Sequence, residues 1–134
     1  MRNEIKKIIV SSDPVNLQVV ESFLIEIDQK YGICSSVYPN ILITLTEAVN
    51  NAIHHGNNAD HNKNIAICCK IKSSGLTFKI SDEGSGFNHK KLPDPTSPEQ
   101  IHKENGRGVY IMKQLSDKLT YKDRGRTVEI HFTL

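Results

Sequence analysis

The sequence lacks any apolar run long enough to serve as a signal peptide or to cross a membrane. It has only three cysteines, with no Cys-x-x-Cys spacing, which argues against a disulfide framework and against a zinc site. The formal net charge is only +2, and lysines and arginines are scattered, so neither nucleic acid nor a membrane is an expected partner. Residues 1–134 are therefore predicted to form a single globular domain in a reducing cytoplasm.

Two periodicities in the apolar residues predict the secondary structure. Helical spacing, bounded by proline or glycine, predicts helices over 14–31, 39–55 and about 107–117. Alternation predicts strands over 4–10, 64–72, 76–80, 118–123 and 126–133. Several helices and several short strands favour an α+β two-layer sandwich, in which helices cover one face of a mostly antiparallel, mixed sheet.

The segment between residues 84 and 106 is polar and contains three prolines. Proline removes backbone donors and blocks regular structure, so the segment is predicted to be one long loop. Loops of this length inside a small domain usually have a function.

Glu47 and Asn51 lie four residues apart on the second predicted helix, so their side chains should project side by side. Thr44 and His54 are expected close to the same polar face. A carboxylate beside an amide oxygen suits Mg²⁺ or the positioning of a hydroxyl group. Taken alone, the pair is more typical of a solvated helix face, because polar pairs at this spacing are common.

A second candidate segment begins at Asp82, directly after a predicted strand, and continues with Gly84 and Gly86. The two glycines allow the backbone to approach a ligand closely. The Asp82 carboxylate could accept a hydrogen bond from an exocyclic amine such as that of adenine. An ordinary tight turn would show the same residues.

A third candidate segment, Asn105-Gly106-Arg107-Gly108, opens the last predicted helix. The free N–H groups and positive dipole end of a helix N-terminus suit a phosphate. No Gly-Lys-Ser/Thr follows, so this is not a P-loop. No strand directly precedes it, so it is not a dinucleotide fingerprint either.

The three segments occur in a fixed order, and together they carry a resemblance. TEAVNNAIHHG (46–56), ISDEGSGF (80–87) and ENGRGVYIMKQLSDKL (104–119) resemble the ATP-binding domain shared by gyrase, histidine kinases, heat-shock chaperones and mismatch-repair ATPases. Within that superfamily, the chain is most similar to the bacterial anti-sigma-factor serine kinases. The likeness covers essentially the whole chain and implies the Bergerat-type ATP-binding fold.

The resemblance also implies roles for the first two segments. Glu47 would be the general base that positions a hydroxyl group, and Asn51 would coordinate Mg²⁺. Asp82 would bind the adenine amino group of ATP. Gly84 and Gly86 would let the base pack closely.

For the third segment, the resemblance implies that Gly106, Arg107 and Gly108 contact the phosphates and that residues 88–105 form a lid over ATP. The family often has an arginine shortly before the Gly-x-Gly, whereas this chain has Lys103. Lysine is a point charge rather than a bidentate fork, so we expect Lys103 to act on the phosphate but to orient it less.

The function that the resemblance implies is a serine/threonine protein kinase that phosphorylates an anti-anti-sigma partner, with a sigma factor as a further candidate partner and a homodimer as the expected assembly. An ATP-dependent binding module with little phosphotransfer is the main alternative. The catalytic domain of a histidine kinase is disfavoured, because no room for a phosphoacceptor helix pair precedes the ATP domain. An intact Glu47 favours the kinase, while Lys103 favours the module.

Overall fold

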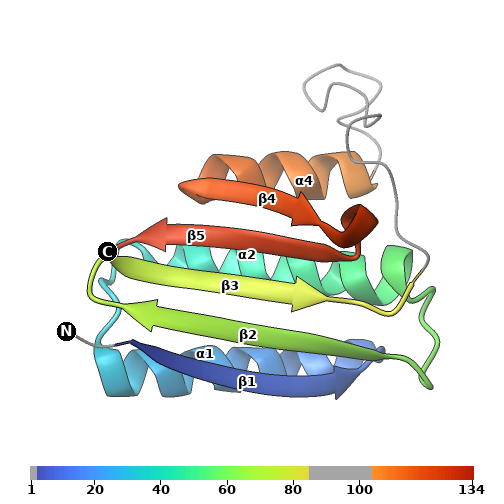
Figure 1. The fold of residues 1–134 in the computed structure, drawn as a ribbon, viewed down its shortest axis with the longest axis horizontal. Coiled ribbons are helices and arrows are strands. Elements are labelled where there is room, and N and C mark those ends of the chain that lie inside the picture. The colour runs from blue at the N-terminus through green and yellow to red at the C-terminus, as the bar shows by residue number, and fades with distance from the viewer. Residues whose placement is uncertain (1–2, 85–103) are drawn as a thin grey trace.

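The computed structural model describes residues 3–84 and 104–134, and five strands in these ranges form one sheet with helices on one face (Figure 1). The strand order is β1-β2-β3-β5-β4. The strands span Glu4–Ser11 (β1), Asn64–Lys72 (β2), Gly75–Ser81 (β3), Lys118–Lys122 (β4) and Thr127–Thr133 (β5). The predicted α+β two-layer architecture is confirmed.

All four pairings between neighbouring strands are antiparallel, which differs from the mixed sheet that we expected. The connection from β3 to β4 includes a described helix, Glu104–Leu115, and a helical connection would ordinarily join parallel neighbours. β3 and β4 do run in the same direction, but β5 lies between them and opposes both. No two adjacent described strands are therefore parallel.

Within the described residues, the helical layer contains three α-helices, with bounds Leu17–Tyr31 (α1), Tyr38–Asn51 (α2) and Glu104–Leu115 (α4). In Figure 1, α1 lies behind β1 and α2 lies behind the middle of the sheet, while α4 packs against α2 beside β4. No helix in the described ranges is both long and apolar enough to cross a bilayer.

The core lies between the sheet and the helices, and the alternating residues predicted from sequence build it. Their side chains are buried on the inner face of the three middle strands: Ile65, Ile67, Cys69, Ile71, Leu76, Phe78, Ile80, Val128, Ile130 and Phe132. The rings of Phe78 and Phe132 meet edge to face, with centroids 6.2 Å apart. Burying one such side chain contributes about 1.5–3 kcal/mol, so alternation fixes which face of the sheet is covered.

The first helix ends at Gly32 as predicted, but its first turn, Pro14–Asn16, is a 3-10 helix that leads into α1. Asp13 Oδ1 accepts a hydrogen bond from the Val15 backbone N–H at 3.0 Å, and Pro14 follows at the first helical position. Gly32 ends α1 in the left-handed conformation, with φ 72°, which glycine adopts without steric cost.

The last helix begins earlier than its glycines suggested. α4 starts at Glu104 rather than near 107, so Gly106 lies in its first turn instead of ahead of it, and Gly108 lies in its second turn. Glycine costs about 1 kcal/mol in a helix interior, so propensity favoured a start after Gly106. Packing of α4 on α2 outweighs that cost. Most of the loop predicted between 84 and 106 lies outside the described residues.

Candidate nucleotide-binding site

Glu47 and Asn51 lie on the last two turns of α2, and both side chains are half-buried. Within the part of the chain that the structure describes, neither side chain makes a hydrogen bond or an ion pair. A half-buried carboxylate and amide with no protein partner retain their full capacity for an external ligand.

Gly108, in the second turn of α4, lies directly against both side chains. A Cβ atom added to Gly108 would lie 2.8 Å from Glu47 Oε2 and 3.4 Å from Asn51 Nδ2. A side chain at residue 108 would therefore displace the Glu47 carboxylate from its present position. The first and third sequence segments therefore meet in space, although more than fifty residues separate them.

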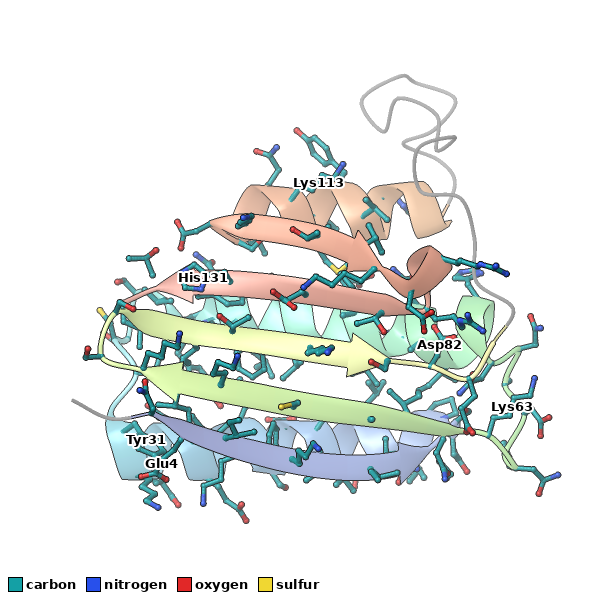
Figure 2. The ribbon with its side chains drawn as sticks, viewed as in Figure 1. Glu4, Tyr31, Lys63, Asp82, Lys113 and His131 are labelled. Carbon is teal, nitrogen blue, oxygen red and sulfur yellow. The ribbon has the colours of Figure 1, made fainter. Side chains whose placement is uncertain are left out.

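Asp82, at the end of β3, defines the other end of the candidate site (Figure 2). Its backbone N–H donates to the carbonyl oxygen of Arg126 at 2.9 Å, and its Oδ1 accepts from the Gly84 N–H at 2.8 Å. A Cβ on Gly56 would collide with the Asp82 carboxylate, and a Cβ on Gly84 would collide with the carbonyl oxygen of Gly56. The lack of a side chain at Gly84 thus lets its backbone lie directly against that of Gly56. The sequence predicted a close backbone approach at Gly84.

Gly56 reaches Asp82 through a wider helical turn that sequence reasoning missed. The helix predicted to about residue 55 is α-helical only to Asn51 and continues as a π-helix over Ala52–Gly56. The Asn57 N–H bonds to the carbonyl of Ala52 at 2.8 Å, which is the five-residue spacing of this turn. Gly56 is the glycine that bounds the predicted helix over 39–55, and nothing in the sequence places it against Asp82.

Asn57 is the second residue that the sequence did not reveal. It is fully buried, and its side chain joins three chain segments. Its Nδ2 donates to Ser12 Oγ at 2.7 Å and to the Asn64 carbonyl at 3.0 Å, while its Oδ1 accepts from the Glu83 N–H at 2.7 Å. Asn57 therefore holds Glu83, the residue after Asp82, next to the end of the π-turn. No periodicity or motif in the sequence points to Asn57.

Burial raises the pKa of the Asp82 carboxyl above its usual range. The Gly84 N–H and the positive charges of Arg126 and Lys63 oppose that shift, and Asp123 adds to it. The carboxylate is thus partly desolvated, yet among the described residues it accepts a hydrogen bond only from the Gly84 N–H. It retains acceptor capacity for a donor such as an amine.

Thr44 and His54 were expected close to the polar face of Glu47 and Asn51, but the structure places them differently. Thr44 is fully buried, and its hydroxyl is the single buried side-chain polar atom without a partner in the described ranges. His54 is exposed on the π-turn. Thr44 therefore belongs to the core and His54 to the surface, so the two side chains do not share one polar face.

The cysteines follow the sequence prediction of opposite faces on one strand. Cys69 is fully buried, and burial raises the pKa of its thiol to about 12. Cys68 is half-buried on the other face, and all three cysteines are free thiols. An un-ionised thiol in the core is a packing residue.

Some predicted site residues cannot be placed in this arrangement. Gly86, Lys103 and nearly all of the predicted lid over 88–105 lie outside the described residues. Gly106 is within the first turn of α4, and Arg107 is exposed beside Gly108.

The donor set at Glu47 and Asn51 fits Mg²⁺ rather than a metal held by protein alone. No group of three or more His, Cys, Asp or Glu side chains gathers within residues 3–84 and 104–134. Mg²⁺ bound with a nucleotide ordinarily takes one or two protein oxygens and completes its shell with phosphate and water. One amide oxygen beside one carboxylate meets that requirement.

Comparison with known proteins agrees with this geometry. Residues 10–132 match the histidine kinase-like ATPase domain. The chain is also similar to the serine-protein kinase RsbW of Staphylococcus aureus strains JH9 and Newman. In both cases the identity is 26% over 128 residues, which covers 87% of this chain and 80% of the relative.

Proposed function

Because this chain belongs to the histidine kinase-like ATPase domain family, which implies ATP binding, we propose that it binds ATP with Mg²⁺ and phosphorylates a serine or threonine of a protein partner. The observation that carries the proposal is the meeting of Glu47 and Asn51 on α2 with Gly108 on α4. A carboxylate, a metal-binding amide and the N-terminal turns of a helix are the groups that phosphoryl transfer requires.

Asn51 would hold Mg²⁺ through its amide oxygen. When bound, the metal would neutralise charge on the phosphates. Glu47 would accept the proton of the attacking hydroxyl group. At the same time the hydroxyl oxygen would bond to the terminal phosphorus of ATP, and the bond from that phosphorus to ADP would break. Both roles suit side chains that have no described protein partner.

Asp82 would accept a hydrogen bond from the adenine amino group, and Gly84 with Gly86 would admit the base. Asn51 and Gly56, which lies against Asp82, stand at the two ends of the π-turn. A ligand with a base at one end and phosphates at the other therefore matches the two ends of the site.

The phosphate end would be completed by the free backbone N–H groups in the first turn of α4, including that of Gly106, by the close approach that Gly108 allows, and by positive charge from Lys103 and Arg107. Residues 88–105 would close over the nucleotide as a lid. These assignments follow the family pattern and the position of α4.

The proposed partner is an anti-anti-sigma protein, with a sigma factor as a further candidate. Support comes from the likeness to a protein named as a serine-protein kinase. We further propose a homodimer that works in the cytoplasm, where ATP is available. An ATP-dependent binding module with little phosphotransfer is the second candidate, and Lys103 in place of the expected arginine favours it.

Nucleotide titration tests the binding half of the proposal. Mg-ATP at 100 times its dissociation constant should stabilise the protein by about 2.7 kcal/mol. Asn51→Ala should lose most of the Mg²⁺ dependence, whereas Asn50→Ala, one position away on the same helix, should keep it. Absence of a wild-type shift at saturating Mg-ATP would contradict nucleotide binding.

Phosphotransfer tests the kinase half. Glu47→Gln should keep ATP affinity within a few-fold and slow phosphorylation of the partner by about 10²- to 10⁴-fold, since a general base acts in the transition state. Glu26→Gln, an exposed carboxylate on α1, is the matched control. Equal rates for Glu47→Gln and wild type would refute the general-base role. A wild type that binds its partner without phosphorylating it would establish the module instead.

A further inference from the structure

The sheet face opposite the helices gathers most of the lysines of the strands. The strand register places six of them on this open face, alongside one acidic residue, Glu129. The lysines are Lys7, Lys70, Lys72, Lys79, Lys118 and Lys122. They come from four strands, so the cluster exists only in the folded chain. Figure 2 looks onto this face, where His131 is labelled on β5.

The positive charge is concentrated rather than evenly spread. Lys7 and Lys79 both lie opposite Cys68, and Lys70 lies opposite Thr77, so the strand register makes Lys70 a diagonal neighbour of Lys7 and of Lys79. Diagonal neighbours are about 7–8 Å apart, close enough to repel.

Glu129, the only acidic residue that the described strands place on this face, is influenced by the charges of the lysines. Lys122 donates to the Glu129 carboxylate at 2.9 Å. The pKa of Glu129 is lowered, first by that hydrogen bond and also by Lys79 and Lys70.

An apolar border lies beside the lysines. Ile5 and Ile9 on β1 point to the same face and are 59% and 69% exposed. β1 forms one edge of the sheet, and no described segment covers the side chain of Ile5 or Ile9. Charged residues next to exposed isoleucines resemble the rim and centre of a protein interface.

We propose that the open sheet face, defined by these six lysines with Ile5 and Ile9, is a docking surface for a folded protein with an acidic, partly apolar face. Charge complementarity identifies the occupant, because carboxylates would relieve the repulsion between Lys7, Lys70 and Lys79. A nucleic acid fits less well: the described strands place no arginine, phenylalanine, tyrosine or tryptophan on this face, and Glu129 would repel a phosphate backbone.

The surface is separate from the nucleotide site. Glu47 and Asn51 lie on α2 and Gly108 lies on α4, both in the helical layer, and Figure 1 shows α2 behind the sheet. A partner on the open face would leave ATP access unchanged. The proposal therefore does not depend on kinase activity.

The test uses the full chain, affinity-tagged, in an extract of the cells that make it. Carbodiimide treatment joins lysine amines to carboxylates that touch them, and the joined peptides are identified by mass spectrometry. The variants are Lys70→Glu and Lys70→Arg, with Lys113→Glu on α4 as a control of the same charge change. Thermal unfolding and ATP affinity are measured for each variant to verify folding.

We expect cross-links from Lys7, Lys70 or Lys79 to Asp or Glu of a partner protein. At an ionic strength of about 0.15 M, Lys70→Glu should weaken capture of that protein by ~10-fold, whereas Lys70→Arg and Lys113→Glu should match wild type. ATP affinity should be the same in all four proteins.

Several outcomes would overturn the proposal. Equal capture by Lys70→Glu and wild type is one, and the absence of cross-links at open-face lysines is another. The proposal is also wrong if the Lys70-dependent partner proves to be nuclease-sensitive, or if phosphatidylserine vesicles bind to this face and acidic protein does not.

Discussion

Gly84 and Gly108 occupy the two ends of the candidate site, and what stands against each of them differs. Gly84 faces a backbone carbonyl, that of Gly56, held by the π-turn. Gly108 faces the end of a flexible side chain, the carboxylate of Glu47. A backbone group cannot move without its helix, whereas a carboxylate can rotate away. The Asp82 end of the site is therefore tied to the fold, and the Glu47 end can change with little cost to it.

The strongest test of this contrast is Gly84→Ala. The new Cβ would collide with the Gly56 carbonyl, so the π-turn or the loop after β3 must shift. We expect a loss of about 3 kcal/mol or more in the free energy of unfolding, at the upper end for overpacking. Chemical denaturation measures it. A loss below ~1 kcal/mol would show that the Asp82 end is as adaptable as the other.

Gly108→Ala sharpens the contrast from the other end. Alanine is favoured over glycine within a helix by about 1 kcal/mol, which offsets the cost of moving the Glu47 carboxylate. Stability should therefore stay within ~1 kcal/mol of wild type. Under the proposed function, displacing Glu47 should slow phosphotransfer on the order of 100-fold, since a misplacement of about 1 Å has that effect.

Denaturation and phosphotransfer assays on one Gly108→Ala preparation separate the two effects. Full activity with unchanged stability would mean that Glu47 does not need its present position.

Asp82→Asn separates binding from stability at the Asp82 end. Losing a charged acceptor for the adenine amine should weaken ATP binding at least ~10-fold, because such hydrogen bonds contribute about 1.5–3 kcal/mol. The amide oxygen can still accept from the Gly84 N–H. Calorimetric titration, with Glu26→Gln as the charge-matched control, measures the change. Unaltered affinity would remove Asp82 from the site.

The pH dependence of stability should change in the same variant. Burial raises the folded pKa of Asp82, so the folded state holds this proton more tightly than the unfolded chain. Its stabilising contribution is complete below the ordinary value of 3.8 and is lost as pH rises through the folded pKa. Asp82→Asn should therefore be at least as stable as wild type at neutral pH without nucleotide. A marked loss of stability there would contradict this sign.

Thr44→Val should have the smallest effect and the opposite direction. Thr44 lies one turn before Glu47 but belongs to the core, where its hydroxyl has no described partner. Valine has nearly the same shape and removes the cost of burying that hydroxyl, so unfolding should require about 1 kcal/mol more. Thr46→Val, which is half-buried, is the control and should change little. Destabilisation by Thr44→Val would reveal a partner for the hydroxyl.

The sequence alone predicted the strands, the inward residues and the residues of both ends of the site. Alternation through Ile65–Ile71 and Val128–Phe132 is a local pattern that burial obeys directly. The four-residue spacing of Glu47 and Asn51 is likewise a local property of a helix.

Only the tertiary structure decided the features that depend on contacts between distant segments. The π-turn that carries Gly56 to Asp82, the links of Asn57 to three segments and the early start of α4 all have no local signal, because packing outweighs propensity there. The lysines show the same limit most plainly. Scattered in the sequence, they gave no reason to expect a charged surface, but antiparallel register brings six of them onto one face, because alternate residues of paired strands share a side of the sheet.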